Sequence, residues 1–302
     1  MKAIVLHEYG PASNLKYEDF ADPKPGAGEV LVRVQAASLN PIDWKLRSGA
    51  AKAIFPLSFP AVLGRDVAGT VRELGEGVEN FAVGDRVFAL SHATYAELCV
   101  VKAADLAKIP DGLEMTTAAA IPLVALTGDQ LIRKAANLQP GQTILLTGAM
   151  GSVGRCALFA ALEIGAHVIA GVRKHKMDEA MDLGAIAAID INDNASIAAL
   201  GALDGIADTV GGSIAAKLIA KVKPGGIFGT VVGPPTNAAL HPTVKVNHIM
   251  ASPDAATIVH YAEAVRDGKL KLPIDRILPL AKAAEAQTAA EKGGIGKVVL
   301  TP

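Results

Sequence analysis

The segment from Gln142 to Ile169 constrains the fold more than any other part of the chain. It reads QTILLTGAMGSVGRCALFAALEIGAHVI: an apolar run, a glycine-rich turn, an amphipathic run and a second apolar run. This order predicts a βαβ unit, in which a strand enters a helix through a tight turn. In such a turn Gly148, Gly151 and Gly154 serve respectively for a tight bend, close approach of the backbone to a pyrophosphate and close helix packing.

The helix start after this turn is suited to hold phosphates, because free N–H groups and the positive end of the helix dipole point at the ligand. The glycine spacing, G-x-x-G-x-x-G, departs from the usual G-x-G-x-x-G, so the support comes from the flanking strand and helix. We expect a dinucleotide site contacted by Gly148, Ala149, Gly151, Ser152, Val153 and Gly154.

Composition limits the class of protein. The chain has 302 residues, of which 51% are hydrophobic, and this is enough for two domains with substantial cores. The net charge of −1 comes from interspersed acids and bases, so we expect no nucleic-acid partner. No apolar run approaches the roughly 20 residues of a membrane span. Two cysteines, Cys99 and Cys156, form no disulfide framework. A soluble, cytoplasmic protein is therefore expected.

The pattern of secondary structure changes along the chain. Short β-rich runs separated by Gly, Pro and Asp predict an all-β region up to about residue 110, and helical spacing follows from 115 to 138. Strand-like and helical runs then alternate from 143 to 246, which predicts an α/β domain with a doubly wound parallel sheet covered on both faces. The final strand, 297–300, is expected to return to the first domain.

The residues after the second strand of the βαβ unit favour NADPH. An NAD site usually places an acid about 20 residues after the glycine turn. Here the strand ends at Val172, the next residues are Arg173, Lys174, His175 and Lys176, and the first acid is Asp178. Cations at this place suit a 2′-phosphate. The alternatives are an NADH site and an ordinary solvated helix start.

The sequence offers neither a metal site nor a nucleophile. Zinc needs clustered Cys, His or carboxylate ligands, and the two cysteines and seven histidines show no such spacing. There is also no G-x-S-x-G elbow. Both absences suit a hydride transfer in which the cofactor carries the reactive hydrogen and the protein orients it.

Several segments, in order, resemble the medium-chain dehydrogenase/reductase superfamily, and specifically its zinc-free quinone oxidoreductase-like branch. They are SLNPID at 38–43, FPAVLGRDVAGTV at 59–71, GVENFAVGDRVFAL at 77–90, ALTGDQL at 125–131, the glycine turn, ADTVGG at 207–212 and the terminal GKVVL. Zinc alcohol dehydrogenases of the superfamily carry a cysteine near Asn40 and Gly-His-Glu in place of Gly64-Arg65-Asp66. This chain has neither, and it lacks the four-cysteine lobe.

The resemblance implies a GroES-like substrate and catalytic domain from 1–124 and 255–302, a Rossmann NADP-binding domain from 125–254, and an active site in the cleft. Members of the branch reduce quinones, alkenals or enones with NADPH. By position, the resemblance places Asn40 and Asp43 near the nicotinamide and the substrate, and we add Arg65 to this catalytic set. It places cofactor contacts outside the glycine turn at Thr127, Arg173, Lys174, Val232 and Gly233, and we also expect contacts from Lys176 and Val210. A homodimer paired through 243–246 would also fit the branch.

Structural explanations compete with these roles. Asn40 and Asp43 flank Pro41 after a strand, where capping of a turn is as natural as ligand contact. Arg65 and Asp66 also fit a simple ion pair, and Trp44 fits core packing. Lys297 fits either a contact to the cofactor or, more simply, the edge of a strand. The leading hypothesis is an NADPH-dependent, zinc-independent reductase of quinones or α,β-unsaturated carbonyls. The alternatives are a non-catalytic NADPH-binding sensor or partner-binding protein and, against the missing ligands, a zinc alcohol dehydrogenase.

Overall fold

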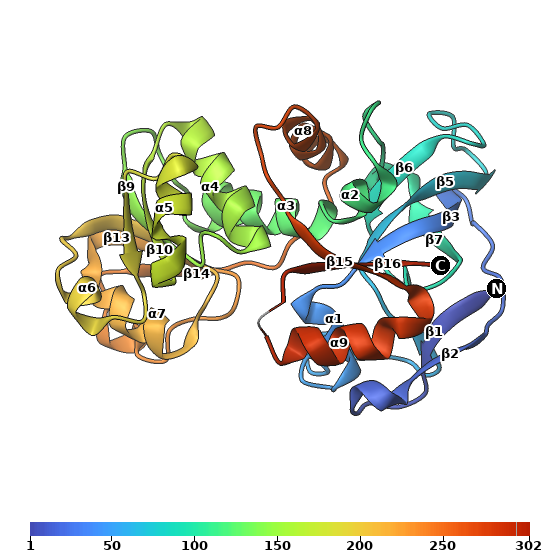
Figure 1. Cartoon of the computed structure of the whole chain (residues 1–302), viewed down its shortest axis with the longest axis horizontal. Coiled ribbons are helices and arrows are strands. Elements are labelled where there is room, and N and C mark those ends of the chain that lie inside the picture. Colours follow the sequence, from blue (N-terminus) through green and yellow to red (C-terminus); the bar gives the residue numbers. More distant parts are fainter. Residues whose placement is uncertain (294) are drawn as a thin grey trace. The chain divides into compact units, whose positions relative to one another are not determined.

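The computed structural model describes residues 1–293 and 295–302, which form two compact units. Unit 1 comprises Met1–Leu123 and Pro253–Pro302, and unit 2 comprises Val124–Ser252. Both chain termini therefore belong to unit 1, as the blue and red ends of the ribbon show (Figure 1).

Unit 2 is built on a six-stranded sheet in the order β11-β10-β9-β12-β13-β14. Every neighbouring pair is parallel, which confirms the doubly wound α/β architecture expected from the alternating pattern. The chain runs outward from β9 in one direction and from β12 in the other, so the order reverses between these two strands. Ligands of such sheets bind at the carboxyl ends of the strands around this reversal. The strands are β9 (Thr143–Thr147), β10 (His167–Val172), β11 (Ala187–Asp190), β12 (Leu203–Asp208), β13 (Val222–Thr230) and β14 (Lys245–His248).

Helices cover both faces of this sheet because its central strands are apolar on both sides. Leu146 belongs to a core with α4, α5 and the helical segment before β9, whereas its neighbour Leu145 belongs to a core with α6 and α7. Successive strand residues thus face opposite layers. The helices are α3 (Pro122–Gln130), a π-helix (Leu131–Ala135), α4 (Ser152–Ile164), α5 (Met177–Asp182), α6 (Asn194–Ala198) and α7 (Gly212–Leu218).

Unit 1 contains two sheets. The smaller has the order β2-β1-β4, and the larger follows β15-β16-β3-β5-β6-β8, with β7 also paired to β3. The C-terminal β16 pairs antiparallel with β3, so the last strand does return to the first sheet system as expected. The strands are β1 (Lys2–Leu6), β2 (Leu15–Asp19), β3 (Glu29–Ser38), β4 (Ala61–Val62), β5 (Asp66–Leu74), β6 (Arg86–Leu90), β7 (Leu98–Lys102), β8 (Leu106–Lys108), β15 (Ile274–Pro279) and β16 (Lys297–Thr301).

The expectation of an all-β region before residue 110 was wrong at α1 (Pro41–Arg47). This helix begins directly after β3 because Asn40 is its N-cap, Pro41 occupies its first turn and the Asp43 side chain accepts the N–H of Asn40 at 2.8 Å. Trp44 packs against the core of the unit, which confirms the packing interpretation. The remaining helices of the unit are α2 (Met115–Ala119), α8 (Ala255–Arg266) and α9 (Ala283–Glu291).

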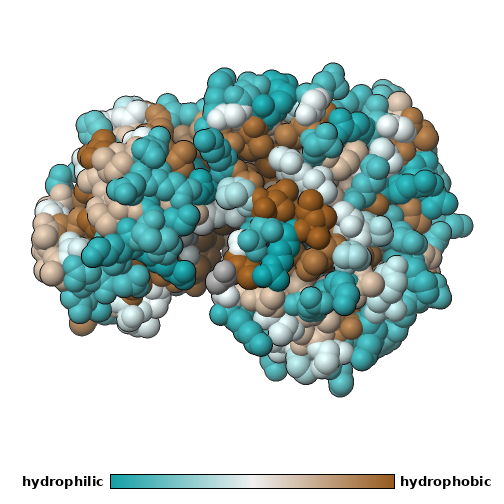
Figure 2. All heavy atoms as spheres, viewed as in Figure 1, coloured by the Kyte–Doolittle hydropathy of each residue, from teal (hydrophilic) through white to brown (hydrophobic). Residues whose placement is uncertain are grey.

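The surface in this view is mostly hydrophilic, and apolar side chains, drawn brown, are partly scattered and partly gathered in a patch near its centre (Figure 2). Among the residues that the structure describes, no helix is both long and apolar enough to cross a membrane.

Candidate functional site

The glycine turn of unit 2 closes tightly on its neighbouring strand. Gly148 has a φ of 64°, in the left-handed region that glycine adopts without strain. Its N–H donates to the carbonyl of Gly171 on β10 at 2.8 Å, and its own carbonyl accepts the N–H of Gly151 at 2.9 Å. The bend expected at Gly148 is therefore present and is held in place from β10.

Gly154 is required for steric reasons. A Cβ atom at this position would lie 2.1 Å from the Gly148 carbonyl oxygen and 2.7 Å from Cα of Ala149. Both neighbours are backbone atoms that a side-chain rotation cannot move, so only glycine lets α4 approach the turn so closely. At Gly151 a Cβ would meet only the Gly148 oxygen, at 3.3 Å, and its other surroundings are open.

The start of α4 presents backbone donors without a side-chain cap. Its N-cap is Gly151, which has no side chain to accept the first N–H groups, and the N–H of Arg155 is the first to reach back, to the Gly151 carbonyl at 2.8 Å. The N–H groups of Ser152, Val153 and Gly154 precede that bond and lack an intrahelical partner. The helix is 13 residues long and is entered through glycines, so its start fits a pyrophosphate.

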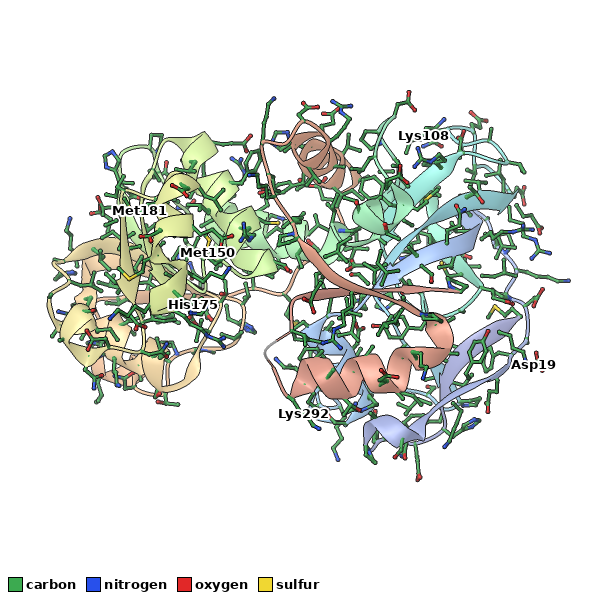
Figure 3. The ribbon with its side chains drawn as sticks, in the orientation of Figure 1. Asp19, Lys108, Met150, His175, Met181 and Lys292 are labelled. Atoms are coloured by element: carbon green, nitrogen blue, oxygen red, sulfur yellow. The ribbon has the colours of Figure 1, made fainter. Side chains whose placement is uncertain are left out.

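The cationic segment after β10, residues 173–176, contains exposed cations and one cation in an ion pair. Arg173 and Lys174 are exposed, whereas Lys176 binds Glu179 at 2.6 Å. Glu179 also binds the guanidinium of Arg155, a buried side chain whose Nε donates to the carbonyl of Met150 in the glycine turn. The labels of Met150 and His175 in Figure 3 mark the turn and this segment.

The other predicted cofactor contacts lie on unit 2 as well. Thr127 is partly buried on α3. Val210 follows β12 and Val232 follows β13, and these large aliphatic side chains are 40% and 43% exposed. Gly233, next to Val232, has a φ of 123°. The residues predicted to contact the nicotinamide therefore come from the carboxyl ends of adjacent strands.

Unit 1 contains a buried polar cluster around Asn40, which we call the Asn40 cluster: Ser38, Asn40, Asp43, Asp66, Tyr95 and Lys297. The Asn40 amide nitrogen donates to Asp66 Oδ2 at 2.8 Å, and Lys297 Nζ donates to the Asn40 amide oxygen at 2.7 Å. Lys297 Nζ also lies 3.5 Å from Asp66 Oδ2. Both ends of the amide are hydrogen-bonded inside the unit, and only 1% of Asn40 is exposed. Its side chain therefore makes its hydrogen bonds within the cluster.

Asp43 is the least satisfied member of the Asn40 cluster. Its Oδ2 accepts the N–H of Asn40 and the hydroxyl of Tyr95, each at 2.8 Å, whereas its buried Oδ1 has no hydrogen-bond partner among the described residues. Burial raises the pKa of Asp43 to about 7, with a smaller contribution of the same sign from the Asp66 charge. The capping interpretation of Asn40 and Asp43 thus describes their local geometry.

Arg65 differs from the other two predicted substrate residues because it is partly exposed. Its Nε donates to the Ser91 carbonyl at 2.9 Å, which leaves the terminal nitrogens of the guanidinium for other contacts. Burial lowers the pKa of Arg65, and the nearby charges of Asp43 and Asp66 oppose that change. The simple Arg65–Asp66 ion pair is not what forms, since the cation that pairs with Asp66 is Lys297.

Sequence reasoning missed two features of these sites. Lys297 does lie at the edge of a strand, as the first residue of β16, but the sequence did not show that it is only 6% exposed and is the cation of the Asn40 cluster. Its position in the otherwise apolar run KVVL was a usable signal, because a buried lysine needs a partner. The buried Asp208, at the end of β12, was not singled out either.

Within the described residues, no group of three or more His, Cys, Asp or Glu side chains is arranged to hold a metal ion.

Comparison with known proteins identifies the family of the chain. Residues 26–111 match the model of the alcohol dehydrogenase GroES-like domain, and residues 183–300 match that of the zinc-binding dehydrogenases. The chain is 32% identical over 332 residues to a quinone oxidoreductase of Pseudomonas aeruginosa, covering 100% of this chain and 99% of the relative.

Solved structures give the same result. The quinone oxidoreductase from Coxiella burnetii superposes with a TM-score of 0.89 at 29% identity, covering 100% of this chain and 99% of that one. A mycobacterial protein complexed with NADPH superposes with a TM-score of 0.84 at 27% identity, covering both chains fully. The chain belongs to the medium-chain dehydrogenase/reductase superfamily, among its quinone oxidoreductase-like proteins. The Pseudomonas and Coxiella relatives are quinone oxidoreductases, and the family is one of oxidoreductases.

Proposed function

We propose that the protein is an NADPH-dependent, zinc-independent reductase of quinones or α,β-unsaturated carbonyl compounds. The observation that carries this proposal is the helix start at Gly151–Gly154. There, a turn in which Gly154 is sterically obligatory presents uncapped N–H groups, at the reversal point of a parallel sheet. The relatives named quinone oxidoreductases and the relative solved with NADPH support the same function.

The residues that would hold the cofactor all lie on unit 2. Gly148, Ala149, Gly151, Ser152, Val153 and Gly154 would hold the pyrophosphate, Arg173, Lys174 and Lys176 the 2′-phosphate, and Thr127, Val210, Val232 and Gly233 the nicotinamide end. Arg173 and Lys174 are exposed cations, so they can bind a 2′-phosphate without first leaving a buried partner. When bound, NADPH supplies the hydride that reduces the substrate.

We assign stabilisation of the substrate oxygen to Arg65. Reduction of a quinone or enone places negative charge on the carbonyl oxygen, and a partly buried guanidinium with free terminal nitrogens is suited to that charge. Asn40 and Asp43 are assigned as positioning residues. Asn40 holds Asp66, which follows Arg65 directly in the chain, and Asp43 holds the Asn40 backbone. Solvent then supplies the proton that completes the reduction.

Turnover is the direct test of this function. Oxidation of NADPH and of NADH is measured with 1,4-benzoquinone, a 2-alkenal and a cyclic enone. We expect turnover with at least one acceptor and a preference for NADPH. Absence of turnover with both cofactors on the whole panel would reject the catalytic proposal. Dialysis against a chelator should leave the activity unchanged, and its loss would reject zinc independence.

A non-catalytic NADPH-binding protein is the second candidate. It is favoured by the burial of Asn40 and Asp43, which leaves Arg65 as the only partly exposed member of the predicted catalytic set. Such a protein would bind NADPH in a fluorescence titration and reduce none of the acceptors. Binding without turnover would therefore select this candidate over the reductase.

The assignment of the cofactor is tested by charge reversal. Replacing Arg173 and Lys174 together by Glu should weaken NADPH binding roughly tenfold or more and leave NADH binding nearly unchanged, because only NADPH carries the 2′-phosphate. Lys217→Glu together with Lys245→Glu, at two exposed lysines of the same unit, makes the same change in net charge and is the control. An unchanged preference for NADPH in the double variant would refute the assignment.

A further inference from the structure

A single buried carboxylate joins the carboxyl ends of three adjacent strands of unit 2. Asp208 is the last residue of β12 and is 0% exposed. Its Oδ1 accepts the hydroxyl of Thr147 at 2.7 Å, and its Oδ2 accepts the hydroxyl of Thr230 at 3.0 Å. Thr147 ends β9 and Thr230 ends β13, so the carboxylate links both neighbours of its own strand.

The same carboxylate also holds the loop that follows β12. Asp208 Oδ1 accepts the N–H of Val210 at 3.2 Å and that of Gly211 at 3.0 Å. The loop after β13 is held through Thr230, whose hydroxyl oxygen accepts the N–H of Val232 at 3.2 Å and lies 3.2 Å from the Gly233 carbonyl oxygen. One side chain therefore sets the conformation of two neighbouring loops.

Neutral donors satisfy this carboxylate. Among the ion pairs of the described residues none includes Asp208, and four hydrogen bonds from hydroxyl and backbone N–H groups surround it. Burying a charge is costly unless all its hydrogen bonds are made. Because a carboxylate only accepts, every surrounding donor has to point inward, and this fixes the orientation of each.

The two loops that Asp208 holds present apolar side chains on a rigid base. Val210 and Val232 are 40% and 43% exposed directly after the buried network. The loops also touch, since a Cβ at Gly211 would lie 2.8 Å from Cγ2 of Val232. Two exposed aliphatic groups held in fixed positions suit one face of a flat, uncharged ring.

We propose that Asp208 is the positioning residue for the nicotinamide: through Thr147 and Thr230 it locks the loops of Val210 and Val232, against which the ring of the cofactor rests. This inference rests on the proposed function, because it assigns the ring to those loops. Asp208 acts through the loops and touches neither the cofactor nor the substrate. Binding strength comes mainly from the phosphates at the glycine turn, so loosening the loops lowers the rate more than the affinity.

The test uses pairs of variants with matched shapes. Thr230→Val keeps the shape of the side chain and removes its hydroxyl, whereas Thr230→Ser keeps the hydroxyl. Asp208→Asn is paired with Asp204→Asn at the other end of the same strand, where the Asp204 carboxylate binds the Thr143 N–H and Lys223. The measurements are kcat, NADPH affinity, the fluorescence lifetime of bound NADPH, which reports on how firmly the nicotinamide is held, and thermal unfolding without cofactor.

We expect Thr230→Val and Asp208→Asn to lower kcat roughly tenfold or more, because displacing a reacting group by about 1 Å can cost a hundredfold in rate. Both should shorten the fluorescence lifetime and change the NADPH affinity by less than about threefold, since the phosphate contacts of the helix start are untouched. Thr230→Ser and Asp204→Asn should behave as the wild type in rate and lifetime.

Wild-type rate and lifetime in Thr230→Val and Asp208→Asn would overturn the inference. It would equally be overturned if Thr230→Ser failed as badly as Thr230→Val, or if rate, affinity and unfolding temperature fell together, since a purely structural role predicts both. If the wild type bound NADPH without turnover, the reductase proposal would fail and the lifetimes would still decide the inference. If it bound neither NADPH nor NADH, both would be rejected.

Discussion

The two units each bury carboxylates, and they satisfy them in different ways. In unit 1 the Asn40 cluster combines Asp43 and Asp66 with one ammonium group, Lys297, and leaves one oxygen of Asp43 without a partner. In unit 2 Asp208 receives four neutral donors and both its oxygens are used. The first arrangement depends on charge balance, and the second depends on the direction of hydrogen bonds.

This difference determines what each site responds to. A cluster of coupled charges changes when one charge is removed or when the pH changes, because each pKa depends on the others. Neutral hydroxyl and N–H donors do not titrate in the physiological range, so a network of them keeps its geometry. We therefore expect the removal of a charge or a change of pH to act mainly on unit 1. The loss of a correctly placed hydrogen-bond donor should act mainly on unit 2.

The largest expected effect is the loss of the cation in unit 1. Lys297→Met should lower the free energy of unfolding by about 3–5 kcal/mol, because it leaves the fully buried Asp66 without its cation. The matched control is Lys223→Met in unit 2, where the lysine of the Asp204 pair is 49% exposed and a change below about 1 kcal/mol is expected. Denaturant unfolding measures both. Equal effects would contradict the contrast between the units.

The second prediction concerns pH. The raised pKa of Asp43, about 7 against an ordinary 3.8, means that the folded protein keeps a proton that the unfolded chain releases. The stability of the protein should therefore fall as the pH rises from about 4 to 7, and this contribution should level off above 7. A shift of this size corresponds to at most about 4 kcal/mol.

Asp43→Asn removes the titrating group and keeps an oxygen that can accept the Asn40 N–H. Unfolding free energies at pH 5 and pH 8 should therefore differ less in this variant than in the wild type. The difference between the two proteins isolates Asp43 from other titrating groups. The same pH dependence in both would show that Asp43 is ionised in the folded protein and would remove the pH sensitivity assigned to unit 1.

The smallest expected effect tests whether a partly exposed charge in unit 2 acts on the cofactor. Glu179 neutralises Lys176 beside the proposed 2′-phosphate site, so Glu179→Gln should tighten NADPH binding roughly threefold at low salt, with less effect at high salt. NADH binding should stay unchanged. Asp182→Asn, which removes an exposed acid from the same helix, is the control. Tighter binding of both cofactors, or weaker binding of NADPH, would contradict this role.

The sequence predicted the βαβ unit and its glycine turn correctly because the relevant interactions are local. Gly148, Gly151 and Gly154 lie within seven consecutive positions, and the strand and helix on either side show their own periodicity. The same holds for the parallel sheet, since alternation of strands and helices leaves few other arrangements. The helix α1 was missed because a single N-cap and a proline, without a long amphipathic run, were read as a turn.

The candidate sites could be predicted less completely from the sequence. Asn40, Asp43 and Arg65 were singled out, but not the partners that decide what they do. Asn40 is engaged by Lys297, which is 257 positions away in the chain, and Asp43 by Tyr95, 52 positions away. Asp208 meets Thr147 across 61 positions. No spacing rule links such residues, because sheet pairing brings them together.

By itself, the sequence determined the class of fold, the place of the glycine turn and the superfamily, since all three depend on short-range patterns and on motifs kept in order. Only the tertiary structure decided which polar groups are buried and which partners satisfy them. It showed that Lys297, at the start of the last strand, is the cation of the Asn40 cluster, and it revealed Asp208. The physical reason is that the energy of a buried charge depends on the donors and charges around it, and in this protein strands distant in the chain supply them.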